Sequence, residues 1–444
     1  MRISSVLKQV SVEPMLVLYY VAAAIATLAG TNLVLLKACN PHHSPAEGDT
    51  CDEVAAQKVV TAINTWRPSF EYSIPVLFIL FAGAWSDAHG KRRKPLMILP
   101  IAGEIVTLFY ITSSVYFWKW TPEMTALFES LFRGLTGGRT CFSFGAITYI
   151  ADNTYPEQRT FRLAIITALI FISSPIGNAL GGILRVTFGF YVVFNVCLIL
   201  NLLALLSGLV LMKRYNDEER LEKSCGLPEL KKTWKTVFKE RTGHNRTIIL
   251  LMLIVSPLFG GCLIGEYSVL YFYLRYKFHW GEADYGFYSA FRMSLTFFGT
   301  LISIGVLSRM CRLSDEVIGL IATTSQIVAA LGNTPFAQFQ WQMFLYPTLD
   351  LMHGAIYTVG HSIVSKVVDS VELGKVNSVL GTVDSLIPLI VFPLYNRTYS
   401  MTFQEKPGTF FLISVAFASV TWVIFLTVIV LRMKQSAKVH TTVN

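Results

Sequence analysis

The sequence predicts an all-α membrane protein whose twelve transmembrane helices form two six-helix bundles. Hydrophobic residues make up 53% of the chain and charged residues only 15%, and the mean hydropathy of +0.51 is far above that of soluble domains. Long apolar runs alternate with short polar loops, and one longer polar segment divides these runs into two sets of six. These observations exclude an ordinary soluble enzyme.

Each helix that crosses a bilayer about 30 Å thick needs roughly 20 apolar residues, because its backbone must satisfy its own hydrogen bonds there. The first such segment is expected to be a retained helix, since it follows two basic residues and lacks the small-residue cleavage site of a signal peptide. The predicted spans are 16–36, 68–85, 95–115, 123–150, 161–184, 190–212, 247–275, 284–307, 316–335, 341–363, 376–396 and 408–431.

The basic residues indicate how the chain is oriented. A formal charge of +9 could suggest a nucleic-acid partner, but Lys and Arg concentrate in alternate loops and in both tails. The positive-inside rule explains this bias and places both termini in the cytosol, with no nucleic acid required. The expected divisions are an N-terminal bundle at 1–212, a cytosolic linker at 213–246, a C-terminal bundle at 247–431 and a cytosolic tail at 432–444.

A glycine- and charge-rich loop follows the second span. It contains Gly83, Asp87, Gly90, Arg92 and Arg93 and resembles the G-x-x-x-D-x-x-G-[RK]-[RK] loop of the major facilitator superfamily. The resemblance implies a latch in which the aspartate pairs with a basic residue in one conformation and releases it in another. The alternative is a basic inner loop with a turn.

Two further stretches narrow the resemblance. They are Asp152 with Gln158-Arg159-Thr-Phe-Arg162, and Ser365-Lys366 with Glu372-Leu-Gly374. Together with the glycine loop they resemble the proton-coupled folate transporter family, solute carrier family 46. The resemblance implies a proton symporter of organic anions, such as folates, muropeptides or steroid conjugates, and it adds Asp152, Arg159 and Arg162 to the latch.

The chain also departs from the folate-transporting branch of that family. Thr167 and Gly138 stand at positions of carboxylates, Gly261 replaces a histidine, and His361 replaces a substrate-facing arginine. Glu266 aligns with an acidic position. Any proton coupling must therefore use residues other than those of the folate transporters.

Two arginines in the fourth span are candidates for binding an anionic substrate. Arg133 and Arg139 lie too deep to reach the interface easily, and a planar guanidinium can grip a carboxylate with two hydrogen bonds. Because they are six positions apart on a continuous helix, only one could point to its centre. The alternative for Arg133 is a structural pair with a carboxylate, such as Asp350 or Asp384. Glu104, in a third span expected outside the cavity, is given no role.

Four ionisable residues in the second half are candidates for proton coupling. Asp350 and His353 share a helical face, and Asp384 lies at a similar depth in the next span. Glu266 is either a proton site or a partner of Arg292. For His353 and His361 the alternative is an internally hydrogen-bonded histidine.

Aromatic residues complete the candidate substrate site. Tyr271 and Tyr357 could stack on a flat ring of the substrate, and His361 could also contact the substrate. Core packing is the commoner role of such aromatic residues. The small residues around Gly177 and Gly181 favour close helix packing.

The first external loop contains Cys39 and Cys51, which are expected to form a disulfide in an oxidising space. Asn396 begins an external glycosylation sequon. No metal site, cofactor motif, P-loop or nucleophile elbow is present in the sequence, so a pump driven by ATP and a membrane hydrolase have no support.

The predicted function is secondary transport of a small organic anion by alternating access, coupled to protons, in the plasma or endolysosomal membrane. The alternatives are a pH-independent uniporter and a non-transporting membrane sensor or scaffold on the same fold.

Overall fold

A computed structural model describes residues 12–44, 51–88, 92–154, 156–212, 236–241, 243–334, 337–368 and 370–443. The regular structure of these residues is entirely helical. Each of the twelve predicted spans overlaps helix, although the helix of the second span begins at Glu53 and that of the twelfth continues to Val443, well beyond the predicted ends. The prediction of an all-helical membrane fold is confirmed.

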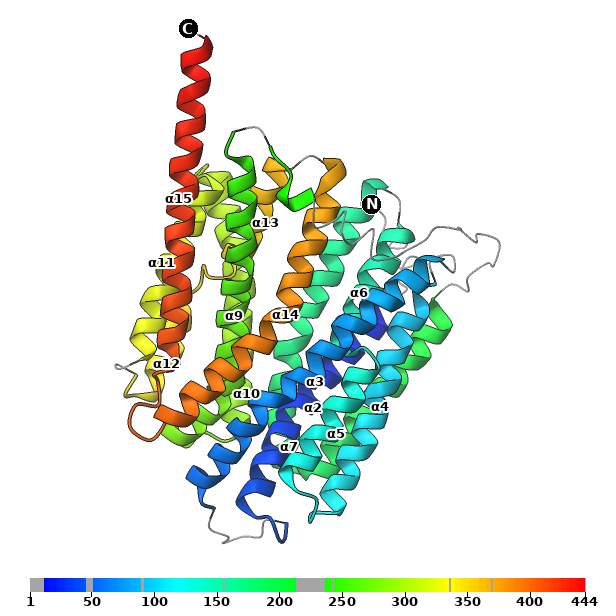
Figure 1. Ribbon diagram of the computed structural model, residues 1–444. Coiled ribbons are helices and arrows are strands. Elements are labelled where there is room, and N and C mark those ends of the chain that lie inside the picture. Colours follow the sequence, from blue (N-terminus) through cyan, green and yellow to red (C-terminus); the bar gives the residue numbers. More distant parts are fainter. Residues whose placement is uncertain are drawn as a thin grey trace. The chain divides into compact units, whose positions relative to one another are not determined.

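The helices of the first half of the chain are α2 (Glu13–Cys39), α3 (Glu53–Ala88), α4 (Lys94–Tyr116), α5 (Pro122–Leu135), α6 (Gly138–Asp152) and α7 (Pro156–Leu211). The second half contains α9 (Asn245–Phe278), α10 (Glu282–Ile302) with a π-helical end η1 (Ser303–Met310), α11 (Asp315–Asn333), α12 (Gln340–Leu349), α13 (Ala355–Val367), α14 (Ser370–Thr402) and α15 (Phe411–Val443). Figure 1 shows their order along the chain.

Eight helices in the described part are long and apolar enough to cross a membrane by length and composition alone. One of them, within α7, contains two predicted spans. The predicted spans outside this set lie in α3, in α5 with α6, and in α12 with α13. Such helices are interrupted or rich in polar residues, and membrane proteins tolerate them where protein or water surrounds them.

The chain divides into two compact units. Unit 1 is Met1–Cys225 with Leu274–Met293, and unit 2 is Gly226–Tyr273 with Ser294–Asn444. The bundle boundaries at residues 212, 247 and 431 remain predictions, and residues 213–235 and 242 of the predicted linker lie outside the described part of the chain.

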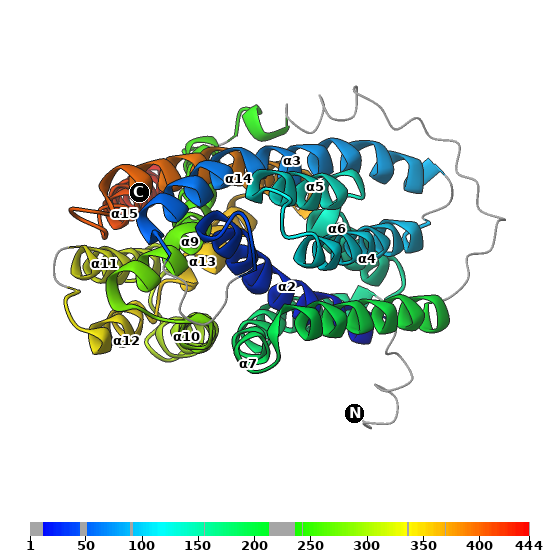
Figure 2. The same ribbon diagram turned by 90° about the horizontal axis from the view of Figure 1, so that it is seen from below.

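In unit 1, α2 packs along α7 (Figures 1 and 2). A Cβ added at Gly177 would meet Ala24 Cβ at 2.5 Å, and one at Gly181 would meet Ile25 Cα at 3.1 Å. Only glycine permits this approach, which supports the packing role expected for these small residues.

The long helix α7 contains a kink between two predicted spans. Gly189 has φ 78° and ψ −179°, which is not a helical conformation. Glycine adopts a positive φ without steric cost, so the chain can turn here between one membrane crossing and the next. The sequence placed the boundary of the fifth and sixth spans at this point.

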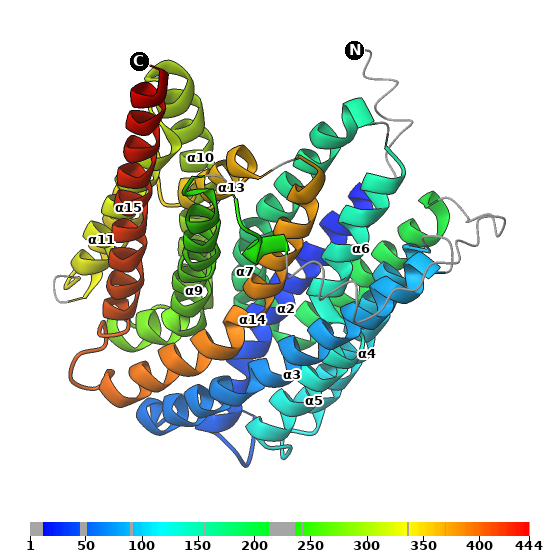
Figure 3. The same cartoon turned by 45° about the horizontal axis from the view of Figure 1, so that its top comes forward.

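In unit 2, α11 packs along α15 (Figure 3). A Cβ added at Gly319 would lie 2.5 Å from the Phe425 ring, so the two helices approach closely. Ile318, Ala322 and Phe425 belong to a buried cluster that also includes Ile356 and Val359 of α13. This core supports the helices that carry the candidate residues of the second half.

The fourth and tenth spans are each broken, where the sequence predicted continuous helices. Gly137 (φ 86°) and Gly138 (φ 50°) separate α5 from α6, and two successive positive φ values require residues without a Cβ. Between α12 and α13, the His353 amide donates to the Asp350 carbonyl and the Ile356 amide to the His353 carbonyl. The fourth helix of each predicted bundle is thus interrupted close to its candidate functional residues.

Candidate functional site

The break between α5 and α6 separates the environments of the two candidate arginines. Arg133 lies in the last turn of α5 and is 4% exposed, whereas Arg139 lies in the first turn of α6 and is exposed. The expectation that only one of the two arginines could point to the centre assumed one continuous helix, so it does not apply here. The glycines direct one guanidinium into the protein and leave the other accessible.

Arg133 is held by two carboxylates. Its Nε and Nη2 donate to the two oxygens of Glu104, each at 2.9 Å, and its Nη1 donates to Glu129 Oε1 at 2.6 Å. The described partners are therefore Glu104 and Glu129, not Asp350 or Asp384. With its donors so occupied inside unit 1, Arg133 serves the packing of α4 against α5, and its substrate role stays a prediction.

The ionic network continues into α3. Arg67 Nη2 lies 2.8 Å from Glu129 Oε1, and Arg67 Nε lies 3.7 Å from Glu71 Oε2. Glu129 Oε2 is buried and has no hydrogen-bond partner among the described residues. We call Arg67, Glu71, Glu104, Glu129 and Arg133 the buried ionic network. It holds three carboxylates against two guanidinium groups.

Arg139 is anchored to α2. Its Nη2 donates to the Ala23 carbonyl at 2.9 Å and to the Thr27 hydroxyl. Both of these bonds use one nitrogen, and no hydrogen bond of the other guanidinium N–H groups is found within the described residues. The neighbouring Tyr20 phenol hydrogen-bonds Ser143 of α6, which strengthens the contact of α6 with α2.

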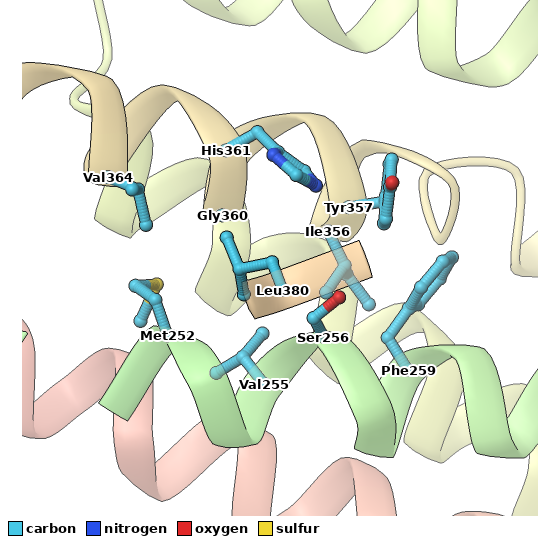
Figure 4. Close-up of a pocket in the computed structure, with 10 residues that line it drawn as sticks. All are labelled: Met252, Val255, Ser256, Phe259, Ile356, Tyr357, Gly360, His361, Val364 and Leu380. Atoms are coloured by element: carbon cyan, nitrogen blue, oxygen red, sulfur yellow. The ribbon is translucent and has the colours of Figure 1, made fainter. Parts of the chain in front are cut away.

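A pocket in unit 2 contains two of the predicted substrate residues (Figure 4). Tyr357 and His361 of α13 face Ser256 of α9 across it, and the ring centroids of Tyr357 and His361 are 4.5 Å apart. The remaining lining is mostly apolar: Met252, Val255, Phe259, Ile356, Gly360, Val364 and Leu380. The cavity has a volume of about 10 Å³, which is room for about one water molecule.

Asp384 adjoins this pocket. The Ser256 hydroxyl lies 2.7 Å and 2.9 Å from its two carboxylate oxygens. His361 Nε2 is buried without a hydrogen-bond partner in the described part of unit 2. The pocket is thus lined by a hydroxyl and an imidazole, and the Asp384 carboxylate lies behind the hydroxyl.

Asp350 and His353 are brought together by a turn, not by the helical face that the sequence predicted. Asp350 caps the end of α12, and its Oδ2 lies 3.0 Å from His353 Nδ1. The His353 ring contacts Phe259 at a centroid distance of 5.1 Å. Because Phe259 also contacts Tyr357, this pair lies one aromatic side chain away from the pocket.

Glu266 is buried among hydroxyl groups. The Ser414 hydroxyl donates to Glu266 Oε1, and the Tyr395 phenol hydrogen-bonds the same serine at 2.8 Å. Glu266 belongs to unit 2 and Arg292 to unit 1, so their pairing stays a prediction. Tyr271 is 4% exposed and packs edge to face on Phe272, which places it in the core, whereas Tyr357 is 43% exposed.

Residues of the predicted latch form ion pairs at the predicted cytosolic ends of helices in unit 1. Arg93 Nε lies 2.9 Å from Asp152 Oδ2, and Arg162 Nη2 lies 2.7 Å from Glu13 Oε1. Ser86 donates to the Arg92 carbonyl and contacts Arg93. Gly83 and Asp87 lie in the last turns of α3 and Arg159 lies in α7, but their side chains, and all of Gly90, fall outside the described part.

Several charged residues of these sites were not singled out from the sequence. Glu129 and Arg67 could have been found from i,i+4 spacing, since Arg67 precedes Glu71 and Glu129 precedes Arg133 by four residues. In unit 2, Glu316 pairs with Arg432 at 2.7 Å. No local signal predicts that pair, because its members lie on different helices.

The loop between α2 and α3 is closed by the disulfide Cys39–Cys51, as predicted. The Trp118 indole donates to the Asn40 carbonyl, and Lys37 Nζ donates to the carbonyls of Trp118 and Trp120. These bonds attach the start of the loop to the end of α4. The described residues contain no group of three or more potential metal ligands.

The Cys39→Ser/Cys51→Ser variant is expected to lose about 2–4 kcal/mol of stability, because the bridge restricts a loop in the unfolded chain. The measurement is thermal unfolding of the detergent-solubilised protein. Cys311→Ser is the matched control, since Cys311 is a free, exposed thiol, and it should leave the transition unchanged. Equal unfolding of both variants and the parent protein would contradict the structural role of the bridge.

The structure contradicts the prediction that Asn396 carries a glycan. Asn396 lies within α14 and is 0% exposed. Its Nδ2, the atom that would be glycosylated, donates to the Ser268 hydroxyl and the Phe392 carbonyl, each at 3.0 Å. The predicted span ended at 396, but the helix continues to Thr402, so the sequon lies inside packed helix.

Comparisons with known proteins agree with this architecture. The sequence profile of the Major Facilitator Superfamily matches residues 59–393. Among solved structures, a mutant of the nucleoside transporter NupG has a TM-score of 0.64 at 14% identity, covering 94% of this chain and 98% of that one. The human organic anion transporter MFSD10 has a TM-score of 0.60 at 17% identity, covering 94% and 97%.

The chain belongs to the Major Facilitator Superfamily, so it is a multi-pass membrane transporter and not an enzyme. Several of its curated relatives belong to solute carrier family 46, the family that the sequence motifs resemble. A probable peptidoglycan muropeptide transporter of Drosophila melanogaster is 24% identical over 77% of this chain and 67% of its own length. The lysosomal proton-coupled steroid conjugate and bile acid symporter of Bos taurus is 28% identical over 77% and 74%.

A third relative, the proton-coupled folate transporter of Rattus norvegicus, is 22% identical over 82% of this chain and 80% of its own length. These relatives move different organic compounds. The family assignment therefore establishes transport and leaves the substrate to be argued from the sites of this chain.

Proposed function

We propose that this protein is a proton-coupled symporter of a small organic anion that works by alternating access. The observation that carries the proposal is Arg139, an exposed guanidinium that α2 holds in place at a glycine break inside a membrane-spanning segment. A fixed cation at such a depth is costly unless it has a function, and its planar fork suits a carboxylate or sulfate.

Tyr357 and His361 of unit 2 are also proposed as substrate-binding residues. Tyr357 and His361 offer a ring surface and a nitrogen, and the rest of the lining is apolar. Folate-like compounds, muropeptides and steroid conjugates remain the candidate classes, and the names of the relatives support each of them.

The proton-coupling role is proposed for three acids of unit 2, of which Glu266 is buried and Asp350 and Asp384 are half-buried. Asp350 with His353, and Asp384 with Ser256, each pair a carboxylate with a group that can exchange hydrogen bonds as a proton arrives. Glu266 has the Ser414 and Tyr395 hydroxyls around it. The latch is proposed to include Gly83, Asp87, Gly90, Arg92, Arg93, Asp152, Arg159 and Arg162.

Plasma and endolysosomal membranes are both proposed locations, with the two termini in the cytosol. The alternatives are a pH-independent uniporter and a non-transporting sensor or scaffold. The departures from the folate-transporting branch at Thr167, Gly138 and Gly261 are compatible with either alternative function.

Uptake of a labelled panel of organic anions, with folates, muropeptides and steroid conjugates included, tests the proposal. Cells that display the protein on their surface are compared with control cells at about pH 5.5 and about pH 7.4. Uptake that is several-fold faster at the acidic pH is expected. Uptake with no pH dependence would favour the uniporter, and no uptake by surface-expressed protein would contradict transport of these classes.

An Asp87→Ala variant that transports normally would contradict the latch.

A further inference from the structure

A short segment from the second half of the chain packs against the first half inside unit 1. This segment, Leu274–Met293, includes the start of α10. A Cβ added at Gly182 of α7 would lie 2.5 Å from the carbonyl oxygen of Glu282. One added at Gly286 of α10 would lie 2.5 Å from the carbonyl oxygen of Asn178. The backbones of α7 and α10 therefore touch, and only glycine fits at either position.

Glu282, the first residue of α10, is buried at this contact. It is 6% exposed. Its Oε1 accepts a hydrogen bond from the side-chain amide of Asn32 in α2 and lies 3.6 Å from Arg185 Nε of α7. Its Oε2 is buried with no hydrogen-bond partner among the described residues. An ionised oxygen in that position has lost its hydration without replacement, which is costly.

The charged groups that face Glu282 come from several helices, whereas α2 contributes the uncharged Asn32. Two cations act on the carboxylate, Arg185 of α7 and Arg275 of α9. Arg275 is itself paired, since its Nε lies 2.9 Å from Glu53 Oε1 of α3. The other titratable residues within five positions along the chain are Lys277, His279, Asp284 and Tyr285. Asp284 is exposed and accepts a hydrogen bond from the Gly281 amide.

A neutral Glu282 would not leave Arg185 without an interaction. The guanidinium carbon of Arg185 lies 3.9 Å from the centroid of the Phe190 ring, which is a cation–π contact. Glu282 precedes the predicted span 284–307. Burial raises its pKa from the usual range of a glutamate to about 7, although Arg185, Arg275 and the Asn32 hydrogen bond act in the opposite direction. The carboxyl therefore titrates near neutral pH while the contact is formed.

We propose that Glu282 binds a proton from the predicted external side and that this proton stabilises the contact of α10 with α2 and α7. The inference rests on the proposed function and adds a site in unit 1 to the four candidate residues of unit 2. The step is the addition of one proton to the unpartnered Oε2, while Oε1 continues to accept from Asn32.

The direction of the pH effect follows from the burial of Glu282. When α10 separates from α7, water solvates the carboxylate and its pKa returns to the usual range. At about pH 5.5 the formed contact then holds more protons than the open one, so acid favours the formed contact. A transporter that alternates access must open and close contacts between its two halves. A proton that enters with the substrate thus helps to close this contact behind it.

The Glu282→Gln variant tests the proposal, because glutamine resembles the protonated acid but does not titrate. The reporter is a Ser289→Cys substitution in a protein whose free cysteines are replaced by serine. Ser289 of α10 is 0% exposed, and its hydroxyl accepts from the Asn178 side chain of α7 at 3.0 Å. A cysteine there reacts with a soluble thiol reagent only when the contact opens.

The reaction rate is measured at about pH 5.5 and about pH 7.4, with Glu282 and with Glu282→Gln. Because both proteins carry the same cysteine, the pH dependence of the thiol itself cancels in the comparison. The rate at the higher pH divided by the rate at the lower pH should be roughly tenfold larger with Glu282 than with Glu282→Gln. Asp284→Asn is the matched control. It removes an exposed acid two positions away and should keep the ratio of the parent.

A second readout is the thermal stability of the detergent-solubilised protein. A carboxyl whose pKa is raised in the folded state makes folding more favourable as the pH falls, because the folded state then binds more protons than the unfolded chain. The parent and Asp284→Asn should therefore gain stability between about pH 7.4 and about pH 5.5 by a margin that Glu282→Gln lacks.

These readouts separate the proton site from the proposed function, since neither depends on transport. If the parent transports none of the anions but differs from Glu282→Gln in both readouts as expected, the proton site stands and the transport assignment fails. Equal labelling ratios in the two proteins, or equal pH dependence of their stability, would overturn the proton site.

Discussion

The Arg133→Met variant is expected to lose about 3–5 kcal/mol of folding stability, the largest loss of any single substitution considered for this protein. Methionine preserves most of the side-chain volume but leaves Glu104 and Glu129, which are 3% and 0% exposed, without their shared cation. The measurements are the thermal unfolding midpoint in detergent and the fraction of protein that reaches the cell surface.

Two comparisons make this expectation specific. Lys239→Met removes a cation that is 58% exposed and pairs with Glu372, and it should cost less than about 1 kcal/mol because solvent screens the pair. The double variant Arg133→Met/Glu104→Met should recover part of the loss, since one unpaired buried charge is removed. An Arg133→Met protein as stable as the parent would contradict the structural role of the network.

The Arg139→Gln variant is expected to lose tenfold or more in kcat/KM for anion uptake. Hydrogen bonds from a charged donor contribute about 1.5–3 kcal/mol, which corresponds to roughly ten- to a hundredfold. Initial uptake rates over a range of substrate concentrations measure the change. Stability should be nearly unaffected, because Arg139 is exposed and its described contacts are with a carbonyl and a hydroxyl of α2.

Arg139→Lys is the matched control for this loss. It keeps the charge but not the planar fork, so an intermediate rate is expected if the anion is held by two parallel hydrogen bonds. Normal uptake by the Arg139→Gln variant would contradict an anion contact at the break between α5 and α6. The two arginines are expected to differ in role: Arg133→Met should reduce folding stability, whereas Arg139→Gln should reduce transport.

Much of the fold could be predicted from local features of the sequence. Runs of about 20 apolar residues marked the spans, and the boundary at residues 184–190 coincides with the kink at Gly189. The cysteines at 39 and 51 form the expected bridge, and only 12 positions separate them in one loop. The family motifs, which are contiguous stretches, led to the transporter assignment that the comparisons confirm.

Helix breaks were harder to predict. Thr136-Gly137-Gly138 is visible in the sequence, but a pair of glycines in an apolar run is also compatible with close packing of a continuous helix. Only the positive φ values show that the chain changes direction there. The same limit applied to Asp350 and His353, which do come together, although through a turn that ends α12 and not on one face of a helix.

The sequence by itself determined the membrane as solvent, the spans, the disulfide and the class of protein, because hydropathy, periodicity and motifs are properties of neighbouring residues. Only the tertiary structure decided the partners of the buried charges. Glu104 meets Arg133 across 29 positions and Arg67 meets Glu129 across 62, and such pairs form because a charge in a dry interior must find a partner on whichever helix the packing places beside it.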